Sequence, residues 1–240
     1  MTARVVALSP EEAGALGAAL IAEHARKALT ARATFSLCLA GGTSPAPLYA
    51  ALAARRDIDW SRGELFLGDE RAVPSNDPRS NLLAAHATLL SKLPAKPAVL
   101  HPMYTGGDVD AAADAYAALL HARLGSERAF DVLLLGLGKD GHTLSLHPDC
   151  TALDERARDV VALHAPPMDP PVDRITLTPP MVERARVVLL FAHGAGKAVA
   201  VRATLAPEGD VRTTPARILH RATGVSLALI DEAAGGAAAR

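Results

Sequence analysis

Short apolar runs alternate along the chain with longer amphipathic stretches of helical length. Several of the short runs are apolar on consecutive positions, which is typical of strands that are buried on both faces of a parallel sheet. Parallel strands need long crossover connections, and the amphipathic stretches have the length of crossover helices. The pattern therefore predicts an α/β fold with an open, mainly parallel, Rossmann-like sheet and helices on both of its faces.

The same pattern predicts where the elements lie. The strands are expected at residues 4–8, 35–40, 64–69, 131–137, 159–163, 186–192 and 225–230. The helices are expected at residues 10–29, 45–56, 80–93, 108–124 and 197–205. Ser9 can cap the first helix and Pro10 fits its first position. The proline-rich segment 164–180 is expected to be an ordered loop around one short strand, so that residues 1–240 form a single domain.

Composition and charge argue against several classes of function, chiefly nucleic-acid and membrane binding. Lys and Arg total 25 against 26 for Asp and Glu, so no general basic field would attract nucleic acid or an anionic membrane. Aromatic residues make up 3% of the chain, so few side chains could stack on the bases of a single-stranded nucleic acid. No apolar run is long enough to span a bilayer, and the first thirty residues lack the pattern of a secretory signal. We therefore expect a cytoplasmic protein, monomeric or weakly homo-oligomeric, without nucleic-acid or membrane partners.

Ligands of open parallel sheets bind beyond the carboxyl ends of the strands, so the chemistry is expected directly after the apolar runs. After the second predicted strand, Gly41 and Gly42 permit a tight turn, Ser44 can act as an N-cap, and Pro45 fits the first helical position. Free amides at the helix start and the hydroxyls of Thr43 and Ser44 form an environment suited to a phosphate. An ordinary glycine-rich turn would show the same residues.

The segment GLGKDG, residues 136–141, satisfies the G-x-G-x-x-G pattern of dinucleotide-binding turns. That fingerprint should lead into a long helix, with an acidic residue at the end of the next strand. Here Pro148 interrupts the segment, and Asp159 opens the next apolar run instead of ending it. The match is therefore interpreted as accidental. What remains is Asp140 and His142 at the mouth of a buried strand, where an imidazole can serve as an acid/base group.

Charged residues follow two other predicted strands. Asp69, Glu70 and Arg71 come at the end of one strand, where a surface ion pair is the alternative to a functional role. Lys197 follows a glycine-containing turn, but Ala198 replaces the hydroxyl of a nucleotide-binding P-loop. A single lysine facing a single phosphate is the functional interpretation, and a solvated lysine in the first helical turn is the alternative.

A metal site is not expected. His147 and Cys150 lie near each other in sequence, but their spacing matches no standard zinc pattern. Cys38 lies inside an apolar run, and a structural role is expected for both cysteines.

Five motifs occur in order along most of the chain and together resemble the 6-phosphogluconolactonase family. Each is weak alone, and their order makes the resemblance specific. They are AGGTSP (40–45), GDERAVP (68–74) with SN (80–81), GLGKDGHTLSLHP (136–148), RITLTPP (174–180) and HGAGKA (193–198).

This resemblance implies hydrolysis of 6-phospho-D-glucono-1,5-lactone to 6-phosphogluconate, the second step of the oxidative pentose phosphate pathway, with no required cofactor. It also implies a fold related to glucosamine-6-phosphate deaminase. His142 would be the general acid/base, with Asp140 or Asp69 orienting its imidazole. Arg71 would stabilise developing oxyanion charge or bind the sugar phosphate.

The resemblance and the local chemistry together favour binding of the 6-phosphate at the helix start after the second predicted strand. Two cationic side chains would supply positive charge there. The expected binding residues are Gly41, Gly42, Thr43, Ser44, Arg174 and Lys197.

The sequence departs from the family pattern at Leu144, where a small residue is usual, and at His147, where an aromatic is usual. The nearest alternative is a sugar-phosphate isomerase or deaminase of the glucosamine-6-phosphate type. Those enzymes carry an acidic residue in an N-E-P run after the histidine, whereas this chain has S-L-H-P at 145–148. A non-catalytic sugar-phosphate sensor is the alternative from another class, although the chain shows no basic helix-turn-helix segment.

Overall fold

A parallel sheet of seven strands forms the centre of the protein, whose computed structural model describes residues 4–42, 44–97, 99–127 and 129–235. The strand order is β1-β10-β9-β6-β2-β3-β5, and every neighbouring pair is parallel. The strands are β1 (Arg4–Ala7), β2 (Phe35–Leu39), β3 (Gly63–Leu67), β5 (Val99–Leu100), β6 (Val132–Gly136), β9 (Val187–Ala192) and β10 (Val225–Ile230). All residues of β2, β3 and β9 are buried, as consecutive apolar runs predict.

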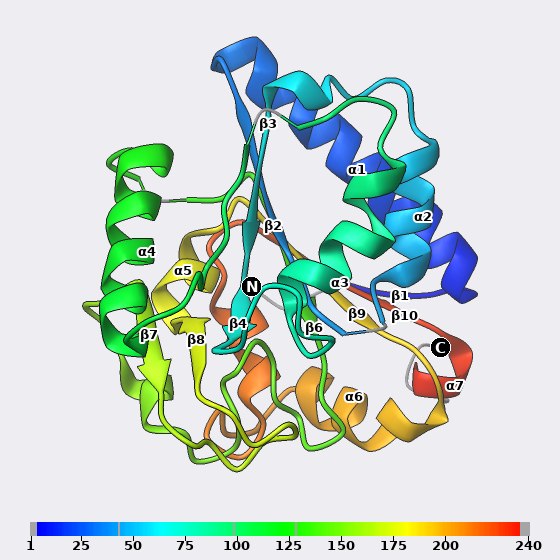
Figure 1. Cartoon of the computed structure of the whole chain (residues 1–240). Helices are drawn as coiled ribbons and strands as arrows, with labels where there is room; N and C mark the ends of the chain where they lie inside the picture. The colour runs from blue at the N-terminus through cyan, green and yellow to red at the C-terminus, as the bar shows by residue number, and fades with distance from the viewer. Residues whose placement is uncertain (1–3, 43, 98, 128, 236–240) are drawn as a thin grey trace.

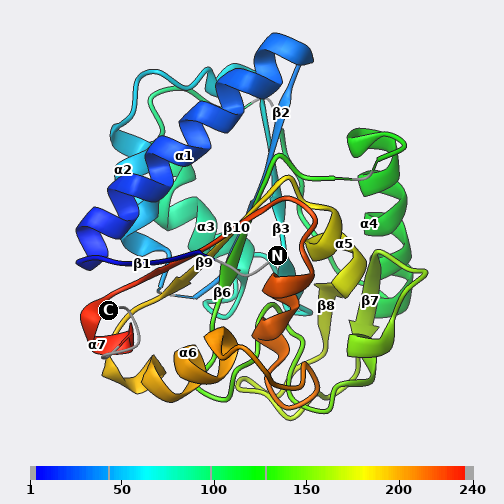
Figure 2. The same ribbon diagram turned by 180° about the vertical axis from the view of Figure 1, so that it is seen from behind.

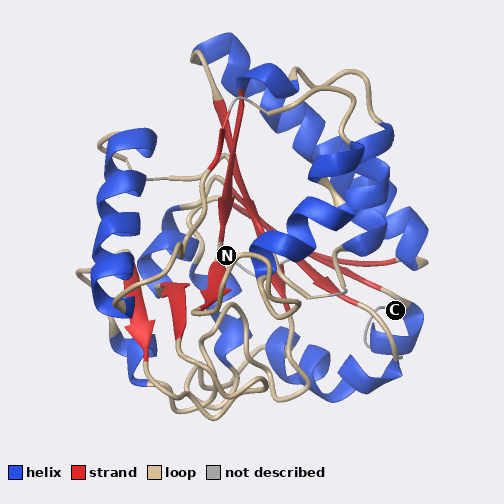
Figure 3. Ribbon diagram, in the orientation of Figure 1, coloured by secondary structure: helices blue, strands red, loops and turns tan. Residues whose placement is uncertain are grey.

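Helices cover both faces of this sheet (Figures 1 and 2). On one side lie α1 (Pro10–Ala31), α2 (Ala46–Ala54) and α3 (Asn81–Thr88), and on the other lie α4 (Val109–Leu124) and α5 (Pro179–Arg184). The remaining helices are α6 (Ala198–Leu205) and α7 (Glu232–Gly235), with short 3-10 segments at η1 (Trp60–Arg62), η2 (Leu90–Lys92), η3 (Thr151–Asp154), η4 (Ala195–Lys197) and η5 (Pro215–Arg221). The predicted α/β fold class is confirmed (Figure 3). No helix among the described residues is long and apolar enough to cross a membrane.

A second, antiparallel sheet of three strands also occurs in the described part of the chain, in the order β4-β8-β7. Its strands are β4 (Asp69–Arg71), β8 (Arg174–Leu177) and β7 (Val160–Leu163). The sequence pattern predicted 159–163 within the parallel series, and that placement is wrong. The loop from β7 to β8 contains no crossover helix, so the chain reverses and the two strands pair antiparallel.

The predicted strand 64–69 is likewise divided between the two sheets. The chain leaves the parallel sheet at Gly68, whose amide donates to the carbonyl of Leu39 and whose carbonyl accepts from the amide of Leu177. Asp69 then begins β4, which pairs with β8 so that Arg71 lies directly opposite Arg174. Two arginines far apart in sequence thereby share one face of the small sheet, next to the carboxyl end of β3.

Two helix starts test the capping expectations. In α1 the Ser9 hydroxyl accepts from the Glu12 amide at 3.2 Å, and the Glu12 carboxylate accepts from the Ser9 amide at 2.9 Å. This reciprocal pair confirms the predicted N-cap. The Ser44 cap is wrong: α2 begins at Ala46, Pro45 occupies the N-cap, and no side chain caps the helix. Because the helix starts later than expected, the side chain of Ser44 is left to line a cavity.

The contrast between the two serines predicts different effects on stability. Ser9→Ala removes a hydroxyl that accepts a helix amide and is expected to lower the free energy of unfolding by about 1 kcal/mol. Ser44→Ala removes no cap and is expected to change it by less than about 0.5 kcal/mol. Urea unfolding followed by circular dichroism measures both, and equal losses in the two variants would contradict this assignment of the caps.

Candidate active site

A cavity of about 540 Å³ lies beyond the carboxyl ends of β2, β3, β6 and β9. This is the edge of a parallel sheet at which ligands are expected. All described residues of the predicted site line it, although they come from separate motifs. They are Gly41, Gly42, Ser44, Asp69, Arg71, Asp140, His142, Arg174 and Lys197. Thr43, which was also predicted, lies outside the described residues.

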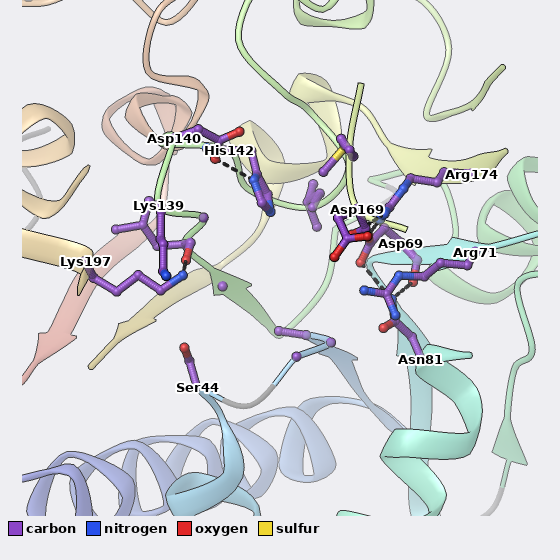
Figure 4. A pocket seen from close by; sticks show the side chains of 18 of the residues that line it. Ser44, Asp69, Arg71, Asn81, Lys139, Asp140, His142, Asp169, Arg174 and Lys197 are labelled. Atoms are coloured by element: carbon purple, nitrogen blue, oxygen red, sulfur yellow. Dashed lines mark hydrogen bonds and ion pairs between the residues drawn. The ribbon is translucent and has the colours of Figure 1, made fainter. Parts of the chain in front are cut away.

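His142 and Asp140 form a close pair at this cavity. Nδ1 of His142 lies 2.6 Å from Oδ1 of Asp140, and the His142 amide donates to the same oxygen at 3.1 Å. Burial would raise the pKa of Asp140, but the hydrogen bonds and charge of His142 together lower it. An ionised Asp140 keeps a proton on Nδ1 and leaves Nε2 free to accept one. Figure 4 shows the imidazole pointing into the cavity.

The loop after β6 is a tight turn and does not lead into a helix. The next helical residues are those of η3, beyond Pro148. The Gly138 amide donates to the His142 carbonyl at 2.7 Å, and a Cβ atom at Gly138 would overlap the imidazole of His142 and the carboxylate of Asp140. Gly138 therefore makes room for the histidine pair, which supports the interpretation that the dinucleotide pattern is accidental.

Asp69 has other partners than His142. Its Oδ2 accepts from the Ser145 hydroxyl at 2.6 Å, and its Oδ1 lies 3.2 Å from Nδ2 of Asn81. Nη1 of Arg174 lies 4.0 Å from Oδ2, within ion-pair range. Of the two carboxylates considered from sequence, Asp140 contacts the imidazole and Asp69 organises the opposite wall.

Arg71 and Arg174 form that opposite wall (Figure 4). Arg71 donates through Nη1 to the Arg79 carbonyl at 2.6 Å, and Arg174 donates through Nη2 to the carbonyls of Asp169 and Pro170 at 3.0 and 3.2 Å. Arg174 is 2% exposed, and burial lowers its pKa. In both arginines Nε is buried and has no hydrogen-bond partner among the described residues.

Lys197 stands on the wall that also carries Ser44 (Figure 4). It ends η4, a turn that follows β9, and its ammonium donates to the carbonyl of Leu137. Burial lowers the pKa of Lys197, as does the nearby charge of Lys139, while Asp140 raises it. The side chain is therefore held at the cavity instead of being a freely solvated lysine.

Several lining residues were missed by the sequence reasoning. Lys139 and His193 lie inside motifs that pointed to the site, directly beside or near predicted residues. Asn81 also belongs to one of these motifs. Met168 and Asp169 come from the proline-rich loop, where composition indicated a loop but not its position. In the described part of the chain, no three His, Cys, Asp or Glu side chains gather in a way that could hold a metal ion.

The two departures from the expected family pattern have different positions. Leu144 lines the cavity with a positive φ of 56°, and its side chain packs against Gly68. His147 is not among the lining residues, and its Nδ1 lies 2.8 Å from the carbonyl of Pro148. Only the leucine therefore changes the wall of the pocket.

The chain is similar to known proteins over most of its length. Residues 9–228 match the family model described as glucosamine-6-phosphate isomerases/6-phosphogluconolactonase. The chain belongs to this family. A 6-phosphogluconolactonase of Streptomyces coelicolor is 41% identical over 223 residues, covering 86% of this chain and 83% of that protein.

Solved structures show a similar fold. A 6-phosphogluconolactonase from Trypanosoma brucei superposes with a TM-score of 0.81 at 30% identity, covering 97% of each chain. A monomeric glucosamine-6-phosphate deaminase also gives a TM-score of 0.81, at 22% identity and with complete coverage of both chains. The second likeness concerns the fold alone, so the division between the two activities within the family has to be argued from the site.

Gly41 lies so close to Asn81 that a larger side chain at this position is expected to destabilise the protein. A Cβ at Gly41 would overlap the amide of Asn81, which is buried and donates to the Asp69 carbonyl at 2.9 Å. Gly41→Ala is therefore expected to lower the free energy of unfolding by about 1–3 kcal/mol. Gly136→Ala is the matched control, because the nearest atom to its Cβ would be 3.9 Å away. Chemical denaturation compares the two, and equal stabilities would contradict the overlap.

Proposed function

We propose that the protein hydrolyses 6-phospho-D-glucono-1,5-lactone to 6-phospho-D-gluconate, the second step of the oxidative pentose phosphate pathway. The main support is the His142–Asp140 pair, whose free imidazole nitrogen faces a cavity with cationic side chains on two walls. The named relatives support the same reaction. The cavity volume of about 540 Å³ lies in the range that encloses small ligands.

In the proposed mechanism, Nε2 of His142 takes a proton from a water molecule as its oxygen attacks the lactone carbonyl carbon. Collapse of the tetrahedral intermediate breaks the bond between that carbon and the ring oxygen, which receives the proton from the imidazolium. Asp140 stays ionised throughout and stabilises the imidazolium through Nδ1–H. No electrons are transferred, so the proposed hydrolysis requires no redox cofactor.

The cationic walls supply the electrostatic part of the mechanism. We assign the 6-phosphate to Gly41, Gly42 and Ser44 together with Lys197, and to Arg174 from the opposite wall. Arg71, beside Arg174, is positioned to stabilise oxyanion charge or to contact the phosphate. Asp69, whose oxygens already have partners, supports the arginine wall.

A deaminase or isomerase reaction has less support from this site. Such an enzyme is expected to carry an acidic residue shortly after the histidine for ring opening. The chain has none between His142 and Pro148, where Leu146 is buried and His147 points to a backbone carbonyl. A lactone is already a closed ring ester, and its hydrolysis needs no such group.

The pathway assignment fits a cytoplasmic enzyme. The cytoplasmic location, the single-domain organisation and the monomeric or weakly oligomeric state stay predictions.

The deciding experiment is an assay of the purified protein with freshly generated 6-phosphogluconolactone. Acid release is expected well above the spontaneous rate. His142→Ala is expected to lower kcat by about 10²–10⁴-fold, because it removes the general acid/base. Asp140→Asn is expected to lower kcat by about tenfold or more with a smaller change in KM, because it no longer fixes the proton on Nδ1.

His121→Ala is the matched control for this assay, because His121 is exposed on α4 and does not line the cavity. A wild-type rate equal to that of buffer would refute the lactonase assignment. Full activity in His142→Ala would refute only the role given to that residue.

The phosphate assignment makes a separate kinetic prediction. Lys197→Ala and Arg174→Ala each remove a charge-assisted hydrogen bond of about 1.5–3 kcal/mol. Each is therefore expected to raise KM by about tenfold or more while kcat falls less, if the phosphate is held equally in substrate and transition state. An unchanged KM in Lys197→Ala would exclude it from the phosphate site. A loss confined to kcat in Arg174→Ala would move Arg174 to the reacting carbonyl.

A further inference from the structure

Lys139 lines the cavity but has no role in the mechanism above. It lies between Gly138 and Asp140 in the turn after β6, and it is exposed. Its ammonium makes no hydrogen bond or ion pair with the residues that the structure describes. The end of its side chain lies against the turn before α6, since a Cβ atom at Gly196 would be 3.5 Å from Cε of Lys139.

That turn also carries Lys197, so the two lysines share one wall of the cavity. Figure 4 shows both side chains running along this wall toward the interior of the pocket. Lys197 is fixed by its bond to the carbonyl of Leu137, two residues before Lys139. The proximity of the two charges is one reason for the lowered pKa of Lys197, after burial.

Two ammonium groups on the same wall of a cavity are an unfavourable arrangement unless an anion lies between or beside them. The carboxylate of Asp140, whose charge raises the pKa of Lys197, already accepts two hydrogen bonds from His142. The two ammonium groups thus have N–H donors without acceptors among the described residues, and their positive charge on the cavity wall is not neutralised. A phosphate dianion would accept hydrogen bonds from both and neutralise their charge, because it offers several acceptor oxygens and twice the charge of a carboxylate.

We propose that Lys139 is a specificity-determining residue that contacts the substrate's phosphate together with Lys197, and so sets the preference for phosphorylated over unphosphorylated sugar lactones. This inference rests on the proposed function for its substrate class, and it adds a second lysine to the site. Because Lys139 is exposed, its contribution is smaller than that of a fully buried cation.

The test compares 6-phosphogluconolactone with unphosphorylated glucono-1,5-lactone in the wild-type enzyme and in Lys139→Gln. For the phosphorylated substrate, KM is expected to rise about tenfold with kcat within about twofold. For the unphosphorylated substrate, kcat/KM is expected to stay within about twofold. Lys139→Arg, which keeps the charge, is expected to restore most of the affinity.

Lys92→Gln is the matched control, since it makes the same change of charge at an exposed position outside the cavity. An unchanged KM for the phosphorylated substrate in Lys139→Gln would overturn the proposal. So would an equal rise in Lys92→Gln, or an equal loss with both lactones. Thermal unfolding of each variant verifies that the fold is intact, and Lys139→Arg provides a second comparison if Lys139→Gln is unstable.

Direct binding separates this proposal from the assignment of the reaction. Calorimetry with 6-phosphogluconate and with gluconate measures phosphate recognition in the absence of turnover. If the protein lacked lactonase activity but Lys139→Gln weakened 6-phosphogluconate binding about tenfold, the reaction would be wrong and the lysine site correct. If the protein were an active lactonase and Lys139→Gln bound 6-phosphogluconate as tightly as the wild type, the lysine site would be wrong and the reaction correct.

Discussion

The buried carboxylate of Asp69 connects the segments that form the site. It lies where the chain leaves the parallel sheet after β3 and enters the small antiparallel sheet. One oxygen accepts from Ser145 in the loop of His142, the other contacts Asn81 at the start of α3, and Arg174 of β8 lies within ion-pair range. Such a buried charge is tolerable only while its partners stay in place, so this one residue couples the histidine loop to the arginine wall.

The cationic side chains of the cavity are divided between two walls. Lys139 and Lys197 stand on one wall and Arg71 with Arg174 on the other, with His142 between them (Figure 4). Of the carboxylates that line the cavity, Asp140 is engaged by the imidazole and Asp69 by the arginine wall, and the charge of Asp169 acts on Arg174. A ligand in the cavity therefore meets cations whose positive charge is only partly offset by carboxylates. The chain as a whole has almost no net charge. Local charge arrangement, rather than overall charge, accounts for anion recognition in a chain with 25 basic and 26 acidic residues.

Local pattern predicted every strand of the parallel sheet except the two-residue β5, and it predicted a site beyond the strand ends, because both depend on short-range signals. Consecutive apolar residues identify strands buried on both faces, and the carboxyl-end rule then places His142 and Lys197 at one edge. The antiparallel sheet was not predicted, because its pairing joins β4 to β8 across a long sequence separation. The opposition of Arg71 and Arg174 follows from that pairing, so no local signal could show it. The failure of the Ser44 cap has a local cause, since Pro45 takes the N-cap itself.

The glycine pattern at residues 136–141 illustrates what such motifs can and cannot indicate. In dinucleotide-binding turns, a glycine lets the backbone approach the pyrophosphate of a ligand. In this chain, Gly138 lets the backbone approach the imidazole and carboxylate of the protein's own His142 and Asp140. The physical requirement, a missing Cβ at a point of close approach, is the same in both cases. The pattern therefore predicts that something lies against the turn, and the residues that follow decide whether it is a cofactor or a catalytic side chain.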